Sequence, residues 1–318
     1  MTAQLQPVDQ RVTGVAEKSP QPQRRRVRSR RRDWPGAVFI TPHMLFLGLF
    51  MLVPTGYAMY LSVFKTRLIG GTKYVGLANY GEVLKSAPFW DGMKRVLLFG
   101  AIQVPLTLLL AFFFAAMFDA GASKFSRTFR TIFFMPFAVP GVVAAVMWSF
   151  LLLPTFGPFS KLAKMLGLGS VNYFSSTLIV PTLVVIVVWS WTGYNMTILY
   201  TSLKSIPREV TEAAIIEGAS LWRITFGLKL AMIRPSIIML AFINTVGALQ
   251  LFTEPQILKT FQEQAVSSGF TPAIYVYNTG IGSSEYNLGA AAAVVLALII
   301  GAISVAAFAF RRRQGEFS

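Results

Sequence analysis

Six apolar runs of about 20 residues decide what this chain can fold into. A helix needs about 20 apolar residues to cross the hydrocarbon of a bilayer, because each residue adds only about 1.5 Å of length. Charged residues make up 13% of the chain, whereas a soluble domain carries about 25%. The sequence therefore predicts an all-α membrane protein with six transmembrane helices. The predicted spans are 37–64, 95–118, 130–153, 178–203, 233–252 and 288–310.

Five prolines fall inside these spans. Proline removes a backbone donor and would break an isolated helix. In a helical bundle, neighbouring helices satisfy the carbonyls that proline leaves free. We therefore expect these prolines to mark kinks rather than ends of spans. They are Pro42, Pro54, Pro105, Pro136 and Pro140.

Lysine and arginine are distributed unevenly between the connecting segments. If the N-terminus is cytoplasmic, the segments on the inside hold 20 of the 29 lysines and arginines. Cytoplasmic loops of membrane proteins carry an excess of these residues. The bias predicts that both termini and the loop 204–235 are cytoplasmic, although the outer loop 65–95 is more basic than this rule expects.

The two ends of the chain are predicted to lie outside the membrane. Residues 1–36 contain the run "QRRRVRSRRR" after a lead with few apolar residues, a composition typical of disordered segments. The basic run is best explained as an anchor near anionic lipid headgroups, and we expect no nucleic-acid partner. The transmembrane domain then comprises 37–310, and residues 311–318 form a short cytoplasmic tail.

The chain has no residues that would power transport or perform catalysis. It has no cysteine and one histidine, His43, so thiolate metal sites and histidine clusters are excluded. The phosphate-loop pattern GxxxxGK[ST] does not occur, and no catalytic combination of acids, bases and nucleophiles stands out. We expect no cofactor, no metal and no enzymatic activity. If the protein drives uphill transport, the energy comes from another chain.

A charged segment, "SIPREVTEAAIIEG" (205–218), separates the fourth and fifth spans. Pro207 suits the first position of a helix, and Glu209 suits the positive end of its dipole. Gly218 can adopt the left-handed conformation that ends a helix, and Ser220 can cap the next one. The pattern predicts a helix–turn–helix lying along the membrane surface.

The predicted helix carries a patch of small residues. Ala213, Ala214 and Gly218 share a face because residues four or five apart lie on the same side of a helix. A partner's surface can approach such a patch closely, and Glu212 lies beside it. The alternative is an amphipathic helix resting on lipid, but such helices carry bulky apolar residues and basic flanks. Three glutamates and a small patch favour docking to a protein.

The segment "EAAIIEGASLWRITFGLKLAMIRPSI" resembles the EAA loop of ABC-importer permeases. That pattern is EAA, three residues, Gly, nine residues and then I-x-L-P. Leu228 and Leu230 stand at its Ile and Leu positions, and Ala231 replaces its proline. The resemblance implies that this loop provides the coupling helix that fits a groove on an ATPase subunit. Four positions match in place: Glu212, Ala213, Ala214 and Gly218.

Further segments resemble carbohydrate-uptake permeases of the maltose and glycerol-phosphate type, in the correct order. They are 73–84, 129–157, 187–214 and 249–258. The resemblance implies the type I ABC-importer permease fold in the cell membrane of a prokaryote. It also implies a heterodimer with a second permease, two cytoplasmic ATPases and an extracytoplasmic solute-binding protein.

The fourth and fifth spans carry side chains that are able to contact a sugar near the middle of the membrane. Tryptophan and tyrosine also form belts at membrane interfaces or pack between helices, and asparagine and glutamine also join helices by hydrogen bonds. Both alternatives stay open for these residues. The candidates are Trp189, Trp191, Tyr194, Asn195, Asn244, Gln250 and Glu254.

The sequence thus favours the permease subunit of a binding-protein-dependent importer that takes up a sugar by alternating access. The alternative is a self-sufficient secondary transporter or channel for a small polar solute. The scarcity of charged residues within the spans argues against the alternative. A disaccharide, an oligosaccharide and a glycerol-phosphate compound would all need similar polar linings, so the cargo stays open.

Overall fold

The computed structural model describes residues 34–67, 70–121, 126–167, 169–261 and 265–313. Most of the predicted N-terminal tail and residues 314–318 of the predicted C-terminal tail lie outside these ranges. The chain divides between Val53 and Pro54 into two compact units. The first unit contributes helix α1 (Trp34–Leu47), which contains Pro42 without ending there, and the π-helical turn η1 (Gly48–Leu52).

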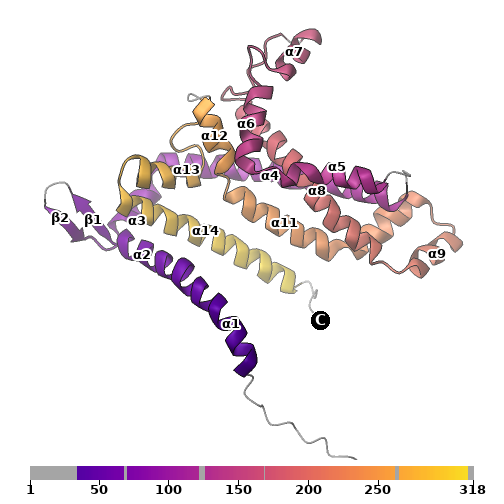
Figure 1. Cartoon of the computed structure of the whole chain (residues 1–318), viewed down its shortest axis with the longest axis horizontal. Coiled ribbons are helices and arrows are strands. Elements are labelled where there is room, and N and C mark those ends of the chain that lie inside the picture. Colours follow the sequence, from indigo (N-terminus) through magenta and orange to yellow (C-terminus); the bar gives the residue numbers. More distant parts are fainter. Residues whose placement is uncertain (1–33, 68–69, 122–125, 168, 262–264, 314–318) are drawn as a thin grey trace, which may run out of the picture. The chain divides into compact units, whose positions relative to one another are not determined.

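The second unit begins at Pro54, one residue into helix α2 (Val53–Ser62), and contains all the elements that follow (Figure 1). Helix α2 leads to an antiparallel hairpin of β1 (Phe64–Arg67) and β2 (Gly71–Tyr74), in which Phe64 lies opposite Tyr74. The elements that follow are α3 (Ala78–Lys85), α4 (Ala87–Asp119), α5 (Ser126–Ala138), α6 (Gly141–Leu151), α7 (Pro158–Met165), α8 (Ile179–Lys204), α9 (Arg208–Ile216), η2 (Arg223–Lys229), α10 (Leu230–Met232), α11 (Arg234–Leu249), α12 (Thr253–Phe261), α13 (Pro272–Tyr277), η3 (Asn278–Gly282) and α14 (Tyr286–Arg313).

Five helices among the described residues are long and apolar enough to cross a membrane, and a bent pair makes a sixth candidate. This count agrees with the six predicted spans. The second span is longer than predicted, because α4 is helical from Ala87 to Asp119. Pro105 lies inside α4 and does not end it. The first span ends at Ser62, so Phe64 belongs to the hairpin and not to the span.

The third span departs from the straight helix predicted for 130–153. Helices α5 and α6 are bent by 96° relative to each other. Pro136 stays inside α5, whereas Pro140 precedes α6 with an extended backbone (φ −55°, ψ 135°). Proline also disfavours helical conformation in the residue before it. The break therefore occurs at Pro140, and it is much larger than a kink.

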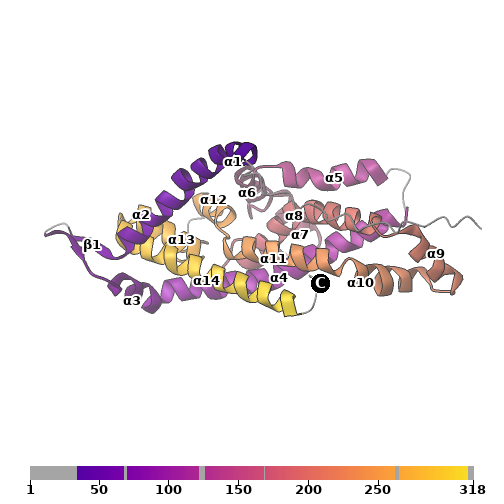
Figure 2. The same cartoon turned by 90° about the horizontal axis from the view of Figure 1, so that it is seen from below.

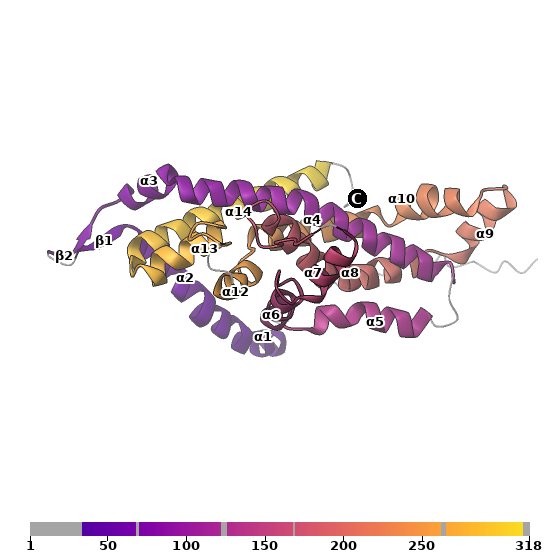
Figure 3. The same cartoon turned by 90° about the horizontal axis from the view of Figure 1, so that it is seen from above.

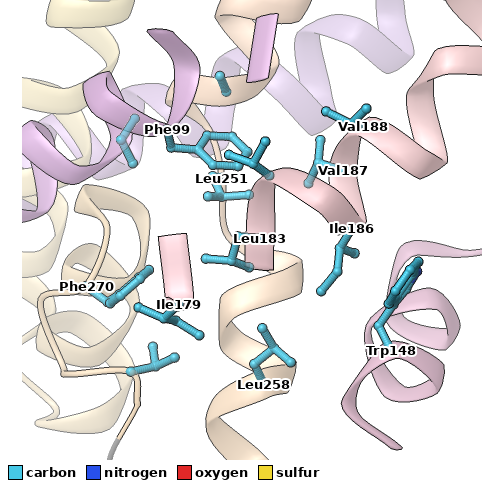
Figure 4. Close-up of a cluster of buried hydrophobic side chains, with 14 of the residues drawn as sticks. Phe99, Trp148, Ile179, Leu183, Ile186, Val187, Val188, Leu251, Leu258 and Phe270 are labelled. Carbon is cyan, nitrogen blue, oxygen red and sulfur yellow. The ribbon is translucent and has the colours of Figure 1, made fainter. Parts of the chain in front are cut away.

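Helix α8 forms the centre of the second unit. It packs against α4, α5 and α11, and 61% of its 18-residue apolar stretch is buried. Figure 4 shows Phe99 of α4 beside Leu251 and near Val187 of α8, and Trp148 of α6 on the side of Ile186 of α8. The close packing of apolar side chains around α8 fixes the positions of the helices that lie beside it.

A glycine permits the closest contact between α8 and the third span. A Cβ atom added to Gly193 would lie 1.8 Å from the carbonyl oxygen of Phe133 in α5. No side chain fits in that space, so the two helices meet through backbone atoms. Small residues at such crossings are typical of membrane helices, because they let backbones approach.

Two buried asparagines hold the hairpin at one end of the second unit. Asn79 Nδ2 donates a hydrogen bond to the carbonyl oxygen of Ser62 at 2.8 Å. Asn287 Oδ1 accepts a hydrogen bond from the Thr66 amide at 3.1 Å, and its Nδ2 donates to the Leu61 carbonyl at 3.0 Å. The start of α14 is thereby bonded to the segment that follows the first span.

Within the second unit, the hairpin and α9 lie at opposite ends (Figures 1, 2 and 3). The hairpin follows the first predicted span, and α9 lies in the loop between the fourth and fifth. An odd number of crossings separates the two segments, so opposite ends are expected for a bundle that crosses a membrane. This arrangement isolates α9 as a surface at one end of the helices.

Candidate coupling loop and translocation pathway

A short exposed helix, α9, connects the fourth span to the fifth. It covers Arg208–Ile216, and Pro207 lies one position before it with an extended backbone (φ −55°, ψ 138°). Pro207 is therefore the residue that precedes the helix rather than its first residue. Glu209 lies in the first turn, where a carboxylate interacts favourably with the positive end of the helix.

The end of α9 has the geometry predicted from its glycine. Gly218 has a φ of +80°, which places it in the left-handed region. The Gly218 amide donates to the Ile215 carbonyl and the Ala219 amide donates to the Ala214 carbonyl, each at 2.9 Å. This pair of bonds defines a Schellman motif. The predicted glycine stop is confirmed.

A second helix begins directly after this turn. The Arg223 amide donates to Ser220 Oγ at 3.3 Å, so Ser220 caps the helix as predicted. The chain continues through η2 and α10 and reaches α11 after a single non-helical residue, Ile233. The loop is therefore joined to the fifth span by nearly continuous helix, which transmits displacement better than a flexible linker.

The surface of the loop is more apolar than its small residues alone suggest. No residue of α9 is buried. Ile215 and Ile216 are 53% and 87% exposed, and Leu221 and Trp222 after the turn are 76% and 72% exposed. Clusters of exposed apolar side chains mark surfaces that contact a partner or a membrane. The patch of Ala213, Ala214 and Gly218 is therefore accompanied by bulky neighbours.

Glu212 lines a cavity of about 270 Å³ beside the ends of the spans. The cavity contains three cationic side chains and two carboxylates, so its lining is basic overall. Glu212 thus lies next to basic residues of its own chain. The charged residues that line the cavity are Asp119, Lys204, Arg208, Glu212 and Lys229.

A second cavity, of about 140 Å³, lies between α4, α8, α11 and the start of α12. Four of the predicted pathway residues line it: Trp191, Asn244, Gln250 and Glu254. Amides and a carboxylate can bond to the hydroxyl groups of a solute, and the indole offers an apolar face. We refer to this space as the pathway cavity.

The broken third span lies beside the pathway cavity. A Cβ atom added to Gly141, the first residue of α6, would lie 3.7 Å from Glu254 Oε1. Thr253, which also lines the cavity, is equally close to that position. The interruption between α5 and α6 therefore brings the start of a helix to the edge of the cavity, as discontinuous helices do in other transporters.

Asn195 does not line the pathway cavity in the described structure. It is completely buried, and its Oδ1 accepts a hydrogen bond from Asn244 Nδ2 at 2.8 Å. Its own Nδ2 donates to the Trp191 carbonyl at 2.8 Å. The geometry supports the alternative stated for these amides, in which hydrogen bonds join one helix to another. Asn244 both joins α11 to α8 and lines the cavity.

Two of the aromatic candidates also pack between helices. Trp189 contacts Trp148 edge-on at 5.7 Å between ring centroids and lines a separate, mostly apolar cavity. Tyr194 stacks on Phe137 of α5 at 4.6 Å. Both side chains connect α8 to the third span, which favours packing over solute contact. Trp191 alone of the three lines the pathway cavity.

The two cavities offer positioning rather than covalent chemistry. In the part of the chain that the structure describes, no group of three or more His, Cys, Asp or Glu side chains is arranged to hold a metal ion. Glu254 is the single acid among the described residues that line the pathway cavity. The carboxylates of the other cavity lie among lysines and an arginine.

Comparison with known families assigns the chain. The family described as the inner membrane component of binding-protein-dependent transport systems matches residues 103–314. The match extends from the middle of α4 through α9 and includes all of α14. The chain belongs to this family. It is a multi-pass membrane protein and a permease of the ABC-importer class, and no comparison supports a self-sufficient transporter.

Known relatives align with this permease over nearly their whole length. The sn-glycerol-3-phosphate transport system permease protein UgpA of Pectobacterium atrosepticum is 30% identical over 90% of this chain and 97% of its own. The lactose transport system permease protein LacF of Rhizobium radiobacter is 27% identical over 89% of this chain and 95% of its own. The resemblance to carbohydrate-uptake permeases predicted from separate segments is confirmed.

A solved structure supports the fold of the permease. The bacterial alginate ABC transporter, solved in complex with an alginate pentasaccharide-bound periplasmic protein, contains a chain with a TM-score of 0.77 and 21% identity. The similarity covers 90% of this chain and 96% of that one. The predicted all-α fold of an ABC-importer permease is confirmed.

Several residues in the two cavities were not predicted from the sequence of this permease. Gln103 is 2% exposed in the middle of α4, lines the pathway cavity and donates to Thr107 Oγ1 at 2.9 Å. The sequence feature that could have identified Gln103 is a single amide side chain within an apolar run. Thr253 adjoins the predicted Glu254, and Asp119 directly follows the second predicted span, 95–118.

Proposed function

We propose that this permease pairs with a second, homologous permease, and that the two together form a pathway for ATP-driven uptake of a carbohydrate. The substrate is delivered by an extracytoplasmic solute-binding protein, and alternating access releases it on the other side. The proposal rests on the exposed, capped helix α9. A nearly continuous helical segment connects α9 to the fifth span, and that span lines the pathway cavity.

The energy is proposed to come from two cytoplasmic ATPase subunits that dock on the loop. Glu212, Ala213, Ala214 and Gly218 are the proposed docking residues. The Schellman turn and the Ser220 cap hold α9 in one orientation, so a partner that displaces α9 also displaces the spans attached to it. ATP hydrolysis then belongs to the partner chains, and this chain is not itself an enzyme.

The proposed cargo is a sugar or a closely related polyol phosphate. The relatives are named for sn-glycerol-3-phosphate and lactose, and the structural relative was solved with an alginate oligosaccharide on its periplasmic protein. The mixture of amides, one carboxylate and an indole in the pathway cavity suits a solute with many hydroxyl groups. Trp191, Asn244, Gln250 and Glu254 are the proposed contacts, together with Gln103.

The proposed orientation places both termini and α9 in the cytoplasm of a prokaryote, with the hairpin outside. The chain has no cysteine, so a cysteine introduced at Ala213 is a unique label site. A membrane-impermeant thiol reagent should not label Ala213→Cys in intact cells and should label it after the cells are opened. Labelling in intact cells would place α9 on the wrong side for an ATPase and would end the proposal.

The function is tested by uptake into proteoliposomes that hold the permease pair, the ATPases and the binding protein. Glu212→Lys reverses the charge at the docking surface, and Glu212→Gln is its matched control. Gly218→Val forces a β-branched residue into the left-handed region, whereas Gly218→Asn tolerates that conformation.

We expect Glu212→Lys and Gly218→Val to reduce ATP-driven uptake by about tenfold or more. Glu212→Lys acts through its reversed charge. Gly218→Val acts through the turn, since left-handed backbone costs an ordinary residue about 1–2 kcal/mol. The Gln and Asn controls should retain most of the uptake. Unchanged uptake in both test variants, with the ATPases still bound, would disprove the assignment of the coupling helix.

A further inference from the structure

A buried carboxylate lies where three helical segments meet at the coupling end of the second unit. Asp119 is the last residue of α4, and its side chain is 7% exposed. Its Oδ1 lies 2.8 Å from Lys204 Nζ, and its Oδ2 lies 2.5 Å from Lys229 Nζ. Lys204 ends α8, and Lys229 ends η2. We call these three residues the Asp119 cluster.

The burial of Asp119 and Lys229 distinguishes the cluster from exposed ion pairs of the same chain, although Lys204 is 50% exposed. The side chain of Lys229 is 17% exposed. In the Lys94–Asp91 pair, at the other end of α4, the side chains are 77% and 52% exposed. Exposed pairs contribute little, whereas a buried carboxylate is costly unless cations compensate it. The position of Asp119 therefore depends on both lysines.

The cluster contains one residue from each side of α9, Lys204 before it and Lys229 after it. Lys229 lies in the helix that leads to the fifth span. Asp119 belongs to neither side, since α4 is the second span. One carboxylate therefore joins the entry and the exit of the loop to a third helix. The cluster lines the same cavity as Arg208 and Glu212, so it adjoins the proposed docking residue Glu212.

We propose that Asp119 is a positioning residue for energy coupling, which clamps both ends of the loop to α4. With the clamp closed, a displacement of α9 moves α4, α8 and the fifth span as one rigid body. Stiff elements that share fixed contacts transmit displacement in this way. Without the clamp, α9 is displaced but part of its movement is lost between the helices. The inference rests on the proposed function, since it assumes that ATPases move α9.

A reversible bridge tests this clamp. In the cysteine-free chain, Asp119→Cys and Lys229→Cys together remove the charges and provide two thiols. A short bis-thiosulfonate reagent bridges them, and a reductant removes the bridge. The double variant is reconstituted with its partner permease, ATPases and binding protein, and both solute uptake and ATP hydrolysis are measured before bridging, after bridging and after reduction.

We expect the unbridged double variant to lose uptake roughly 2- to 30-fold, the range found for residues that modulate coupling between sites. ATP hydrolysis should persist, so more ATP is consumed for each solute carried. Bridging should recover most of the uptake, and reduction should abolish the recovery. A residue needed only for folding would not show this reversible change in the ratio of ATP to solute.

The matched control is Asp91→Cys with Lys94→Cys, the exposed pair on the same helix. It should transport normally with and without the bridge. Normal uptake by the unbridged Asp119→Cys/Lys229→Cys variant would overturn the clamp, and so would a bridge that lowers uptake or fails to restore it. If the unaltered complex shows no ATP-driven uptake, the proposed function fails first, and this outcome is separate from any failure of the clamp.

Discussion

Helix α8 is joined to its neighbours in two different ways along its length. In the middle it contacts α5 through the backbone at Gly193 and α11 through the Asn195–Asn244 amide pair. At the end that leads to α9 it contacts α4 through Lys204 and the Asp119 carboxylate. Among the described residues, these contacts of the middle are neutral, whereas the end adds charged ones.

The difference follows from the surroundings of each region. A charge in the middle of a bilayer is expensive, whereas neutral amides can join helices there at low cost. At the end of a span, water and headgroups stabilise charges, and a lysine side chain can reach along the helix to them. Close packing therefore sets the distance between helices at depth, and charge sets which ends meet at the surface. Three substitutions would test this comparison.

The largest effect is expected at the neutral contact between α8 and α5. Gly193→Ala places a Cβ against the Phe133 carbonyl, so the two helices must separate, and we expect the free energy of unfolding to fall by about 3 kcal/mol. Thermal unfolding in detergent measures this change. Gly301→Ala is the control, because nothing lies within 4 Å of its added Cβ, and it should be neutral or slightly stabilising. Equal behaviour of the two variants would show that the helices do not meet at Gly193.

An intermediate effect is expected at the amide pair. Asn244→Leu removes the amide group that donates a hydrogen bond to Asn195 Oδ1. The free energy of unfolding should fall by about 0.6 kcal/mol and by at most about 1.7 kcal/mol, the contribution of a hydrogen bond between membrane helices. The loss should not change with salt concentration. Thr245→Val is the matched control, since Thr245 Oγ1 bonds only within its own helix, to the Ala241 carbonyl. A salt-dependent loss in Asn244→Leu would contradict the neutral character of this region.

The smallest effect is expected at Lys204. Its side chain is 50% exposed, so Lys204→Met should reduce the free energy of unfolding by about 1 kcal/mol or less. High salt should shrink the difference from the unaltered chain, because salt screens exposed charges. Lys229→Met, at the more buried partner, should cost more and respond less to salt. The reverse order would mean that exposure does not set the strength of the cluster.

Sequence patterns predicted the spans and the helix–turn–helix around α9 because their causes are local. The length of an apolar run sets a span, and the spacing of Gly218 and Ser220 sets a turn and a cap. Each signal lies within a few residues of the structure that it produces. The left-handed glycine and the Ser220 cap were therefore predicted residue by residue.

The features that the sequence missed depend on distant contacts. The partners of Asp119 lie 85 and 110 residues away in the sequence, and no local pattern connects them. Helix α6, which follows the bend at Pro140, packs against α12, with Thr253 and Glu254 beside Gly141, and α12 lies more than 100 residues later in the sequence. Proline revealed that a disturbance would occur, but not that it would reach 96°.

The proposed pathway residues were chosen by residue type within the fourth and fifth spans. Trp191, Asn244, Gln250 and Glu254 line one cavity, and their contact with a solute stays a prediction. Type alone does not separate an amide that faces a cavity from one that bonds to another helix. Asn195 and Asn244 illustrate this. The same hydrogen bond joins the two side chains, yet only Asn244 lines the pathway cavity.

Asn287 has a consequence for the order in which the protein is made. The Thr66 amide bonds to a side chain 221 residues later in the chain, so this bond forms only after nearly the whole protein has left the ribosome. Contacts between such distant residues form late. The β1–β2 pairing and the bonds of Asn79 are local, so we expect the hairpin to form early and to be fixed to α14 only when the final helix is inserted.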